Sequence, residues 1–348
     1  MKSDGERLAL PLSASRPPSY AHQHPEVGKL AVAPTVAPAA AAERARTPPL
    51  RQLRFLLEYA ALRATIGVMR LVPLRLAVDC SAALTRRLVP RVNPKRHRKA
   101  LENLRIAFPD KSEAERVAIC MAHWENLGRV IAETLQMDRL LKDPSRIEIP
   151  NQTLITRYRD KLGPAIGVSL HMGNWELAIW PFVVAGANPA ALYRAIPNPY
   201  VERYLMARRQ VLYPAGLLGR RRPDASPLED MQTAHRLMDC VRDGGRVGII
   251  SDQYYKRGVA VPFFGRATLV PPIAAIMARR LGARIWIARC LRIGTDSRFR
   301  IDIAELRVPR TANQADDVQS ALNAIHAQFE RWIREAPAQW LWGHRIWR

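Results

Sequence analysis

The sequence lacks the features that mark secreted, disulfide-linked and membrane-spanning proteins. Its four cysteines are widely scattered with no paired spacing for a zinc site or a disulfide framework, so we expect buried free thiols in a reducing compartment; they are Cys80, Cys120, Cys240 and Cys290. No apolar run of signal-peptide length follows Met1, which predicts a chain that stays on the cytoplasmic side. No stretch of about 18 uncharged apolar residues occurs either, so a spanning helix is not expected.

Acidic residues and cofactor motifs are also scarce. The chain has 31 acidic and 54 basic residues, a formal net charge of +23, which favours nucleic acid, anionic lipid or an acidic protein as partner. No nucleic-acid module with interleaved aromatic and basic residues is present, so a nucleic-acid partner is not expected. Because Gly-x-Gly-x-x-Gly and Walker-type loops are missing, the sequence predicts no nucleotide, no metal and no cofactor.

What the chain does contain is one main domain behind a tail. Residues 1–48 are rich in Pro, Ala and Ser without an apolar period, which indicates a disordered tail. Residues 49–348 are long and apolar enough to bury a large core. Within them, Ser112 and Glu115 form a capping-box pattern that predicts the start of a long helix.

The segment 53–92 combines apolar stretches with regularly interspersed arginines. A basic helix with an apolar face can lie in the headgroup layer, its arginines meeting anionic lipid while its leucines enter the acyl boundary. An amphipathic helix that covers the domain core would give the same pattern. We keep both interpretations, and the first predicts a membrane-associating region.

Short apolar runs separated by helical patterns follow. Runs at 165–170, 191–196, 246–251 and 283–291 are typical of buried strands, and 298–306 alternates with period two, as an edge strand does. Strand alternating with helix predicts an α/β sandwich with a mostly parallel sheet. In such sheets the site lies beyond the carboxyl ends of the strands.

His171 comes directly after the first of these runs. Glu176 follows five residues later, which on a continuous helix would place the two side chains about 140° apart, so they can meet only across a strand-to-helix turn. In that arrangement Glu176 would accept a hydrogen bond from one imidazole nitrogen and leave the other free to take a proton from a hydroxyl. The pair is therefore a candidate hydroxyl-activating dyad.

Further polar residues follow other predicted strands. Arg194 follows Leu192 and Tyr193 toward the end of the second run, and Asp252 and Gln253 come after the third. Polar groups at neighbouring strand ends converge on one crevice in such a sheet. An arginine there could bind a phosphate or stabilise an oxyanion.

Several ordered motifs carry a resemblance to a known family. They are Asn103-Leu104-Arg105-Ile106-Ala107-Phe108-Pro109, His171-Met172-Gly173-Asn174-Trp175-Glu176, Tyr193-Arg194 with Asn198-Pro199-Tyr200, Ser251-Asp252-Gln253, Val261-Pro262-Phe263-Phe264-Gly265 and Pro337-Ala338-Gln339-Trp340-Leu341-Trp342-Gly343-His344-Arg345. In order and spacing the chain resembles the lipid A biosynthesis lauroyl/myristoyl acyltransferases. Ile346 departs from the pattern, since the family often has a second arginine there.

The resemblance implies a fold similar to the glycerolipid acyltransferases and a function in lipopolysaccharide biosynthesis at the cytoplasmic face of the cell inner membrane. An acyl chain would pass from acyl carrier protein to a hydroxyl of a Kdo-bearing lipid A precursor. The implied catalytic residues are His171 as base and Glu176 as its orienter, and the implied substrate-binding residues are Arg194, Asn174, Asp252 and Gln253. An acyltransferase acting on another glycolipid or an aminolipid is the alternative, and a non-catalytic binder of anionic membrane or nucleic acid is the alternative from a different class.

Overall fold

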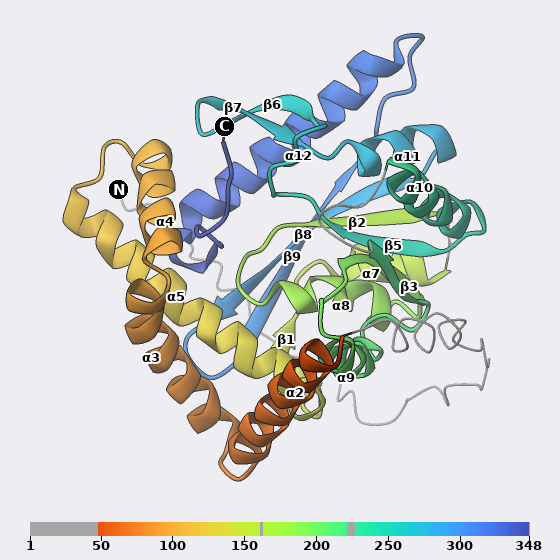
Figure 1. Ribbon diagram of the computed structural model, residues 1–348. Coiled ribbons are helices and arrows are strands. Elements are labelled where there is room, and N and C mark those ends of the chain that lie inside the picture. The colour runs from red at the N-terminus through yellow and green to blue at the C-terminus, as the bar shows by residue number, and fades with distance from the viewer. Residues whose placement is uncertain (1–47, 161–162, 221–226, 348) are drawn as a thin grey trace, which may run out of the picture. The chain divides into compact units, whose positions relative to one another are not determined.

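The computed structural model describes residues 48–160, 163–220 and 227–347 (Figure 1). The tail expected over residues 1–48 lies, up to residue 47, outside the described residues. The helices are α2 (Pro49–Arg70), α3 (Leu74–Val92), α4 (Pro94–Ala107), α5 (Glu113–Leu135), α6 (Met137–Leu140), α7 (Gln152–Asp160), α8 (Trp180–Val184), α9 (Pro199–Arg209), α10 (Pro227–Arg242), α11 (Ile273–Leu281) and α12 (Gln314–Glu335). Short 3-10 helices are η1 (Pro144–Arg146), η2 (Trp175–Ile179) and η3 (Pro337–Gln339).

A seven-stranded sheet forms the centre, in the order β1-β9-β8-β2-β5-β3-β4. Only the β8–β9 pair is antiparallel among its described pairings, so the predicted mostly parallel sheet is confirmed. A separate antiparallel hairpin joins β6 and β7. The strands are β1 (Ile147–Glu148), β2 (Ala165–Ser169), β3 (Pro189–Arg194), β4 (Gly216–Arg220), β5 (Arg246–Ile250), β6 (Val259–Phe263), β7 (Arg266–Val270), β8 (Arg284–Ile293) and β9 (Arg298–Leu306).

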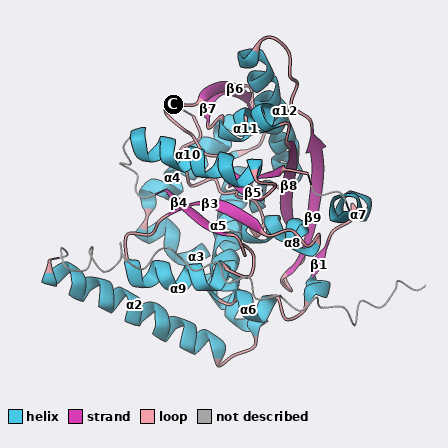
Figure 2. Ribbon diagram, turned by 90° about the vertical axis from the view of Figure 1, so that its right-hand side faces the viewer, coloured by secondary structure: helices cyan, strands magenta, loops and turns pink. Residues whose placement is uncertain are grey.

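The sheet buries both of its faces, as Figure 2 shows. On β2, Ile166 and Val168 belong to a core that includes side chains of α10, α11 and α12. The intervening Gly167 faces the other side, where an added Cβ would come within 2.9 Å of the Phe182 ring. That ring stacks on Trp286 of β8 with centroids 4.7 Å apart. Each such buried large side chain contributes about 1.5–3 kcal/mol, and a strand buried on both faces has the continuous apolar pattern seen in the sequence.

One strand differs from the prediction. The period-two segment at 298–306 forms β9, but β1 pairs with it at Phe299 and Arg300, so β9 is second from the edge rather than the edge strand. The pairing covers only two residues. Beyond Arg300 the outer side of β9 has no strand partner among the described residues, which accounts for its half-polar alternation.

The predicted capping box is present at the start of α5. Ser112 accepts a hydrogen bond from the backbone N–H of Glu115, and the Glu115 carboxylate accepts one from the Ser112 backbone N–H. The expectation of buried thiols holds for Cys120 and Cys290, whereas Cys240 is partly buried and Cys80 on α3 is exposed.

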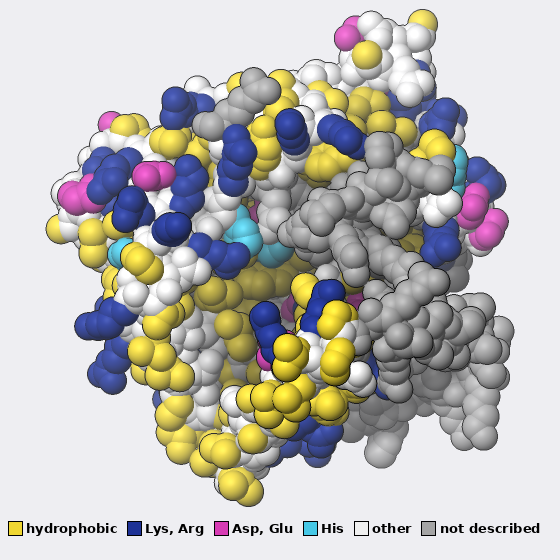
Figure 3. All heavy atoms as spheres, viewed as in Figure 1, with side chains coloured by type: hydrophobic (Ala, Val, Ile, Leu, Met, Phe, Trp, Pro, Cys, Tyr) yellow, Lys and Arg dark blue, Asp and Glu magenta, His cyan; other side chains and the backbone are white. Residues whose placement is uncertain are grey.

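The segment expected at the membrane forms two helices, α2 and α3, which meet at a bend just before Leu74. Neither, nor any other described helix, is long and apolar enough to cross a bilayer. Many of their large apolar side chains are exposed, including Leu53 at 54%, Leu57 at 62% and Leu84 at 58%. Figure 3 shows these apolar side chains gathered over α2 and α3, where no described element covers them.

Candidate active site

His171 lies just past the carboxyl end of β2, which ends at Ser169. Its backbone N–H donates to Oδ2 of Asp252 at 2.8 Å, and its ring Nδ1 lies 2.7 Å from Oδ1 of the same carboxylate. Asp252 follows β5, the parallel neighbour of β2. Two adjacent strand ends thus bring together residues 81 positions apart, as expected for polar residues at this edge of a parallel sheet.

The carboxylate of Asp252 is buried and fully hydrogen-bonded. Its Oδ2 also accepts a hydrogen bond from Nε1 of Trp340 at 2.7 Å. Burial alone would raise the pKa of Asp252, but the charge of His171 and the hydrogen bonds from His171 and Trp340 outweigh burial and hold the pKa below its ordinary value. An ionised carboxylate can only accept, so Nδ1 of His171 carries a proton and Nε2 is the nitrogen left to receive one.

The surroundings of the imidazole leave that second nitrogen near polar groups. Nε2 of His171 lies 3.5 Å from Nε2 of Gln253, at the limit of a hydrogen bond. The ring meets Trp175 edge-on at 5.3 Å and lies roughly parallel to the ring of His344 at 6.2 Å. The His171 side chain retains 18% exposure, so an acceptor hydroxyl can reach it.

The predicted hydrogen bond between Glu176 and His171 is wrong. Oε2 of Glu176 accepts from Nε of Arg209 on α9 at 2.9 Å, and Oε1 accepts from Nη2 of the same guanidinium. The chain enters η2 directly after Asn174, which carries Glu176 toward α9, and Asp252 occupies the position at Nδ1. The orienter of the imidazole therefore comes from the neighbouring strand end.

The four residues expected to bind substrate do not all face the reactive side of His171. Asn174 is fully buried, and its amide nitrogen donates to Glu133 of α5 at 2.9 Å, so this group faces the protein interior. Both oxygens of Asp252, which the resemblance places among the substrate contacts, are occupied by His171 and Trp340. Arg194 is the last residue of β3, at the same edge of the sheet, but its side chain lies outside the described residues. Gln253 is the one of the four whose described contact is with the reactive side of His171.

The C-terminal segment 339–342 pairs with the loop after β2, a contact that the sequence did not predict. Met172 and Trp340 form an antiparallel bridge, and the backbone N–H of Leu341 donates to the carbonyl of His171 at 3.0 Å. The backbone N–H of Gly173 donates to the carbonyl of Gln339 at 2.9 Å. The loop after β2 is thus paired like a short strand, although no local sequence signal links residues so far apart.

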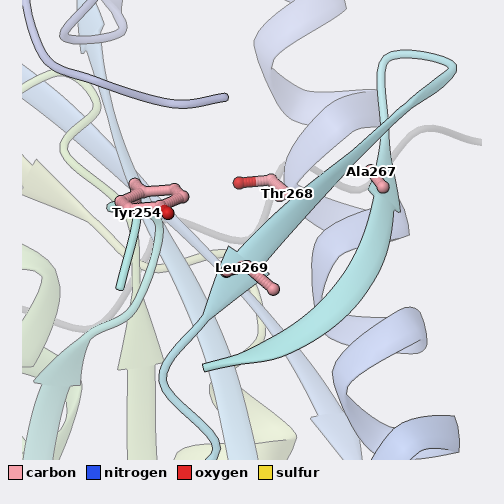
Figure 4. Close-up of a pocket in the computed structure, with 4 residues that line it drawn as sticks. All are labelled: Tyr254, Ala267, Thr268 and Leu269. Atoms are coloured by element: carbon pink, nitrogen blue, oxygen red, sulfur yellow. The ribbon is translucent and has the colours of Figure 1, made fainter. Parts of the chain in front are cut away.

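A cavity of about 250 Å³ opens between Tyr254 and β7 (Figure 4). It is lined by Tyr254, Ala267, Thr268 and Leu269, so it begins two residues after Asp252 and extends along β7. Arg345 lies over the Tyr254 ring at 4.4 Å.

The part of the chain that the structure describes has no set of side chains arranged to bind a metal ion. There, no group of three or more His, Cys, Asp and Glu side chains has metal-binding geometry.

Comparison with known proteins places the chain in a family. It is 26% identical over 172 residues to a phosphatidylinositol mannoside acyltransferase of Mycolicibacterium smegmatis (strain ATCC 700084 / mc(2)155). The alignment covers 49% of this chain and 52% of the relative, so it spans about half the length of that curated protein. The model of the bacterial lipid A biosynthesis acyltransferases matches residues 45–348 and confirms the resemblance carried by the motifs. The chain belongs to the bacterial lipid A biosynthesis acyltransferase family.

Proposed function

We propose that this protein transfers a fatty acyl chain from acyl carrier protein to a hydroxyl of a Kdo-bearing lipid A precursor at the cytoplasmic face of the inner membrane. The observation that carries the proposal is the partly buried hydrogen bond of 2.7 Å between Nδ1 of His171 and Asp252. It fixes the tautomer in which Nε2 can act as a base toward a hydroxyl. We further propose that the fold is of the glycerolipid-acyltransferase type.

The reaction needs one proton acceptor and no covalent acyl-enzyme. Nε2 of His171 takes the proton of the acceptor hydroxyl as its oxygen attacks the thioester carbonyl carbon. The tetrahedral intermediate then collapses, the C–O bond is retained, the C–S bond breaks, and the imidazolium returns the proton to the leaving thiolate. Asp252 stabilises the imidazolium in between. Arg194 and Gln253 are the candidates for stabilising the oxyanion.

The helices α2 and α3 support action at a membrane surface. Their exposed leucines can enter the acyl boundary while neighbouring arginines meet anionic headgroups. Asn198, at the start of α9, hydrogen-bonds the Phe55 carbonyl and the Glu58 carboxylate of α2, each at 2.9 Å. Since α9 also carries Arg209, the partner of Glu176, this contact links the apolar surface to the candidate site.

The region where α3 ends and α4 begins supports an acidic protein as acyl donor. Seven basic and no acidic residues occur between positions 86 and 99. Arg86 and Lys99 pair with carboxylates, whereas Arg87, Arg91, Lys95, Arg96 and Arg98 have no ion-pair partner among the described residues. Figure 3 shows basic side chains gathered over α4. Asn103 on the same helix holds the carbonyls of Trp342 and His344, so this surface lies beside the candidate site.

A second candidate acceptor comes from the relative with 26% identity, whose name specifies a phosphatidylinositol mannoside. The base and its orienter would serve either acceptor, because both offer a hydroxyl. We favour the lipid A precursor because the family model covers residues 45–348, far more of the chain than that alignment.

An in vitro assay separates these acceptors. Purified protein is incubated with acyl carrier protein loaded with chains of several lengths and with either the Kdo-bearing precursor or a phosphatidylinositol mannoside, and products are followed by mass spectrometry. We expect one added acyl group on the precursor, and none with His171→Ala. Transfer to the mannoside alone, or equal transfer by His171→Ala, would overturn the proposal.

A further inference from the structure

The loop that follows His171, residues 172–174, rests on a buried ion pair between Glu133 and Arg292. Glu133 of α5 is fully buried, and its carboxylate accepts hydrogen bonds from Nη1 and Nη2 of Arg292 at 2.5 and 2.8 Å. It also accepts from Oγ of Ser297 at 2.7 Å and from the amide nitrogen of Asn174 at 2.9 Å. One carboxylate therefore joins β8, the β8–β9 turn and the loop.

A second arm reaches the same loop from the same guanidinium. Nε of Arg292 donates to Oδ1 of Asn126 at 3.1 Å. The amide nitrogen of Asn126 donates to the carbonyls of Gly173 and Gln339 at 3.2 and 3.3 Å. The network thus holds two consecutive loop residues, Gly173 and Asn174, as well as the C-terminal segment that pairs with them.

The loop is pressed directly on the strand that carries Arg292. Gly173 has φ = +58°, and a Cβ added there would overlap the carbonyl oxygen of Cys290. The side chain of Gln339 closes the arrangement, because its Oε1 accepts from the Arg292 backbone N–H at 2.8 Å and its Nε2 donates to the Arg292 carbonyl at 3.0 Å. Apart from the bonds that join the two residues, the described side-chain hydrogen bonds of Glu133 and Arg292 go to Asn174 of the loop, to Asn126, which contacts the loop, and to Ser297.

From this arrangement we propose that Glu133 and Arg292 are positioning residues that fix the loop, and with it His171, for acyl transfer; the inference rests on the proposed function. A buried ion pair is often no more stabilising than apolar residues of similar volume, so stability alone does not explain this one. The need to place a reacting group accurately explains the ion pair, because a displacement of about 1 Å can slow a reaction on the order of 100-fold.

The test replaces the whole pair, so that no charge is left buried alone. In the variant Glu133→Leu/Arg292→Met we expect kcat to fall roughly 100-fold while KM stays within about threefold, because the substrate contacts are untouched. The matched control is Arg279→Met/Asp317→Leu, which removes an ion pair of 2.7 Å whose Asp317 is similarly buried and whose described contacts do not reach the loop. The control should keep kcat.

A second variant covers the case in which the double replacement fails to fold. Asn126→Leu removes the hydrogen bonds to the carbonyls of Gly173 and Gln339 and leaves Glu133 and Arg292 paired, and we expect kcat to fall about tenfold. If the pair acts through Asn174, adding Asn174→Ala to the double variant should not multiply the loss, as a double-mutant cycle shows. Wild-type kcat in Asn126→Leu or in the folded double variant would overturn the inference.

Hydrogen exchange keeps this inference separable from the proposed function. The amides of Gly173 and Leu341 should exchange at least about tenfold faster in Glu133→Leu/Arg292→Met than in wild type and in the control variant, because local opening sets exchange rates. Unchanged protection would refute the positioning role whether or not the wild-type protein transfers acyl chains. An inactive wild type with faster exchange in the variant would refute only the proposed function.

Discussion

Arg209 of α9 holds both carboxylate oxygens of Glu176 through Nε and Nη2 of its guanidinium. Burial would lower the pKa of Arg209, but the charge of Glu176 and its hydrogen bond outweigh burial and raise it, so the guanidinium keeps its charge. A bidentate pair of this kind fixes geometry as well as charge. Glu176 therefore joins the segment after the loop to α9, and Asp252 is the carboxylate that serves the imidazole.

Substitution of Asp252 should mainly lower kcat, whereas substitution of Glu176 should mainly lower stability. In Asp252→Asn the orienting acceptor is lost and the tautomer of His171 is no longer fixed, so we expect kcat to fall by about 10²–10⁴-fold. In Glu176→Gln one acceptor oxygen remains for Arg209, and we expect a lower melting temperature with kcat reduced less than about tenfold. Steady-state rates and thermal unfolding of both variants check this.

Circular dichroism at the assay temperature provides the control, since both proteins must be folded when their rates are compared. If Glu176→Gln lost as much kcat as Asp252→Asn without losing stability, Glu176 rather than Asp252 would be the working partner of His171.

Gly173 in the loop after β2 and Gly186 shortly after α8 both have positive φ, so a substitution at Gly186 serves as the control for one at Gly173. Gly173 has φ = +58° with the Cys290 carbonyl against it, whereas Gly186 has φ = +76° with nothing within 4 Å of an added Cβ. Alanine at position 186 should cost about 1–2 kcal/mol of unfolding free energy, the ordinary penalty of the left-handed region. Alanine at position 173 should cost more and abolish acyl transfer, because the loop must move away from β8. Equal losses of stability in chemical denaturation would contradict the close packing.

Membrane binding should depend on the exposed face of α2. Replacing Leu53 and Leu57 by Glu puts two charges where about 1.5–3 kcal/mol per leucine is gained on burial, so binding to anionic vesicles should weaken at least about tenfold. The wild-type protein should also bind less well as salt rises, because the arginines are screened. Cosedimentation measures both effects. Met231→Glu, which changes an exposed apolar residue on α10, should bind as wild type does; a matching loss in that variant would point to a nonspecific charge effect.

The pH dependence of stability should carry a contribution from His123. Burial lowers the pKa of His123 to about 3, against about 6.5 in an unfolded chain. The unfolded state therefore binds more protons between these values, so this contribution to stability is complete above pH 6.5 and is lost progressively as pH falls toward 3. His123→Gln should reduce the slope of unfolding free energy against pH by up to one proton, measured by denaturant unfolding at pH 7.5, 6 and 5. An unchanged slope in His123→Gln would refute the assignment.

Much of the sheet could be predicted because its signals are local. The apolar runs at 165–170 and 246–251 became β2 and β5 within one residue, since a strand buried on both faces must be continuously apolar. β4 was missed because Gly216–Arg220 has only two large apolar residues. β1, with two residues, is too short to leave a pattern.

The candidate site was predictable in place but not in pairing. Strand-end convergence correctly brings Asp252 near His171, because it depends only on parallel neighbours. The choice between Glu176 and Asp252 as the imidazole partner depends on how tightly the chain turns into η2, and spacing does not specify that turn. The contact of Trp340 with Asp252 joins residues 88 positions apart and has no local signal at all.

The pairing of residues 339–342 with the loop after β2 also sets an order of events during synthesis. His171 and Asp252 leave the ribosome well before Trp340, and domains fold largely as the chain emerges. Until Trp340 arrives, one oxygen of Asp252 lacks its indole donor and Gly173 lacks its backbone partner. The nascent protein can therefore assemble its sheet in advance, but the site is complete only after residues 339–342 have been translated and have paired with the loop after β2.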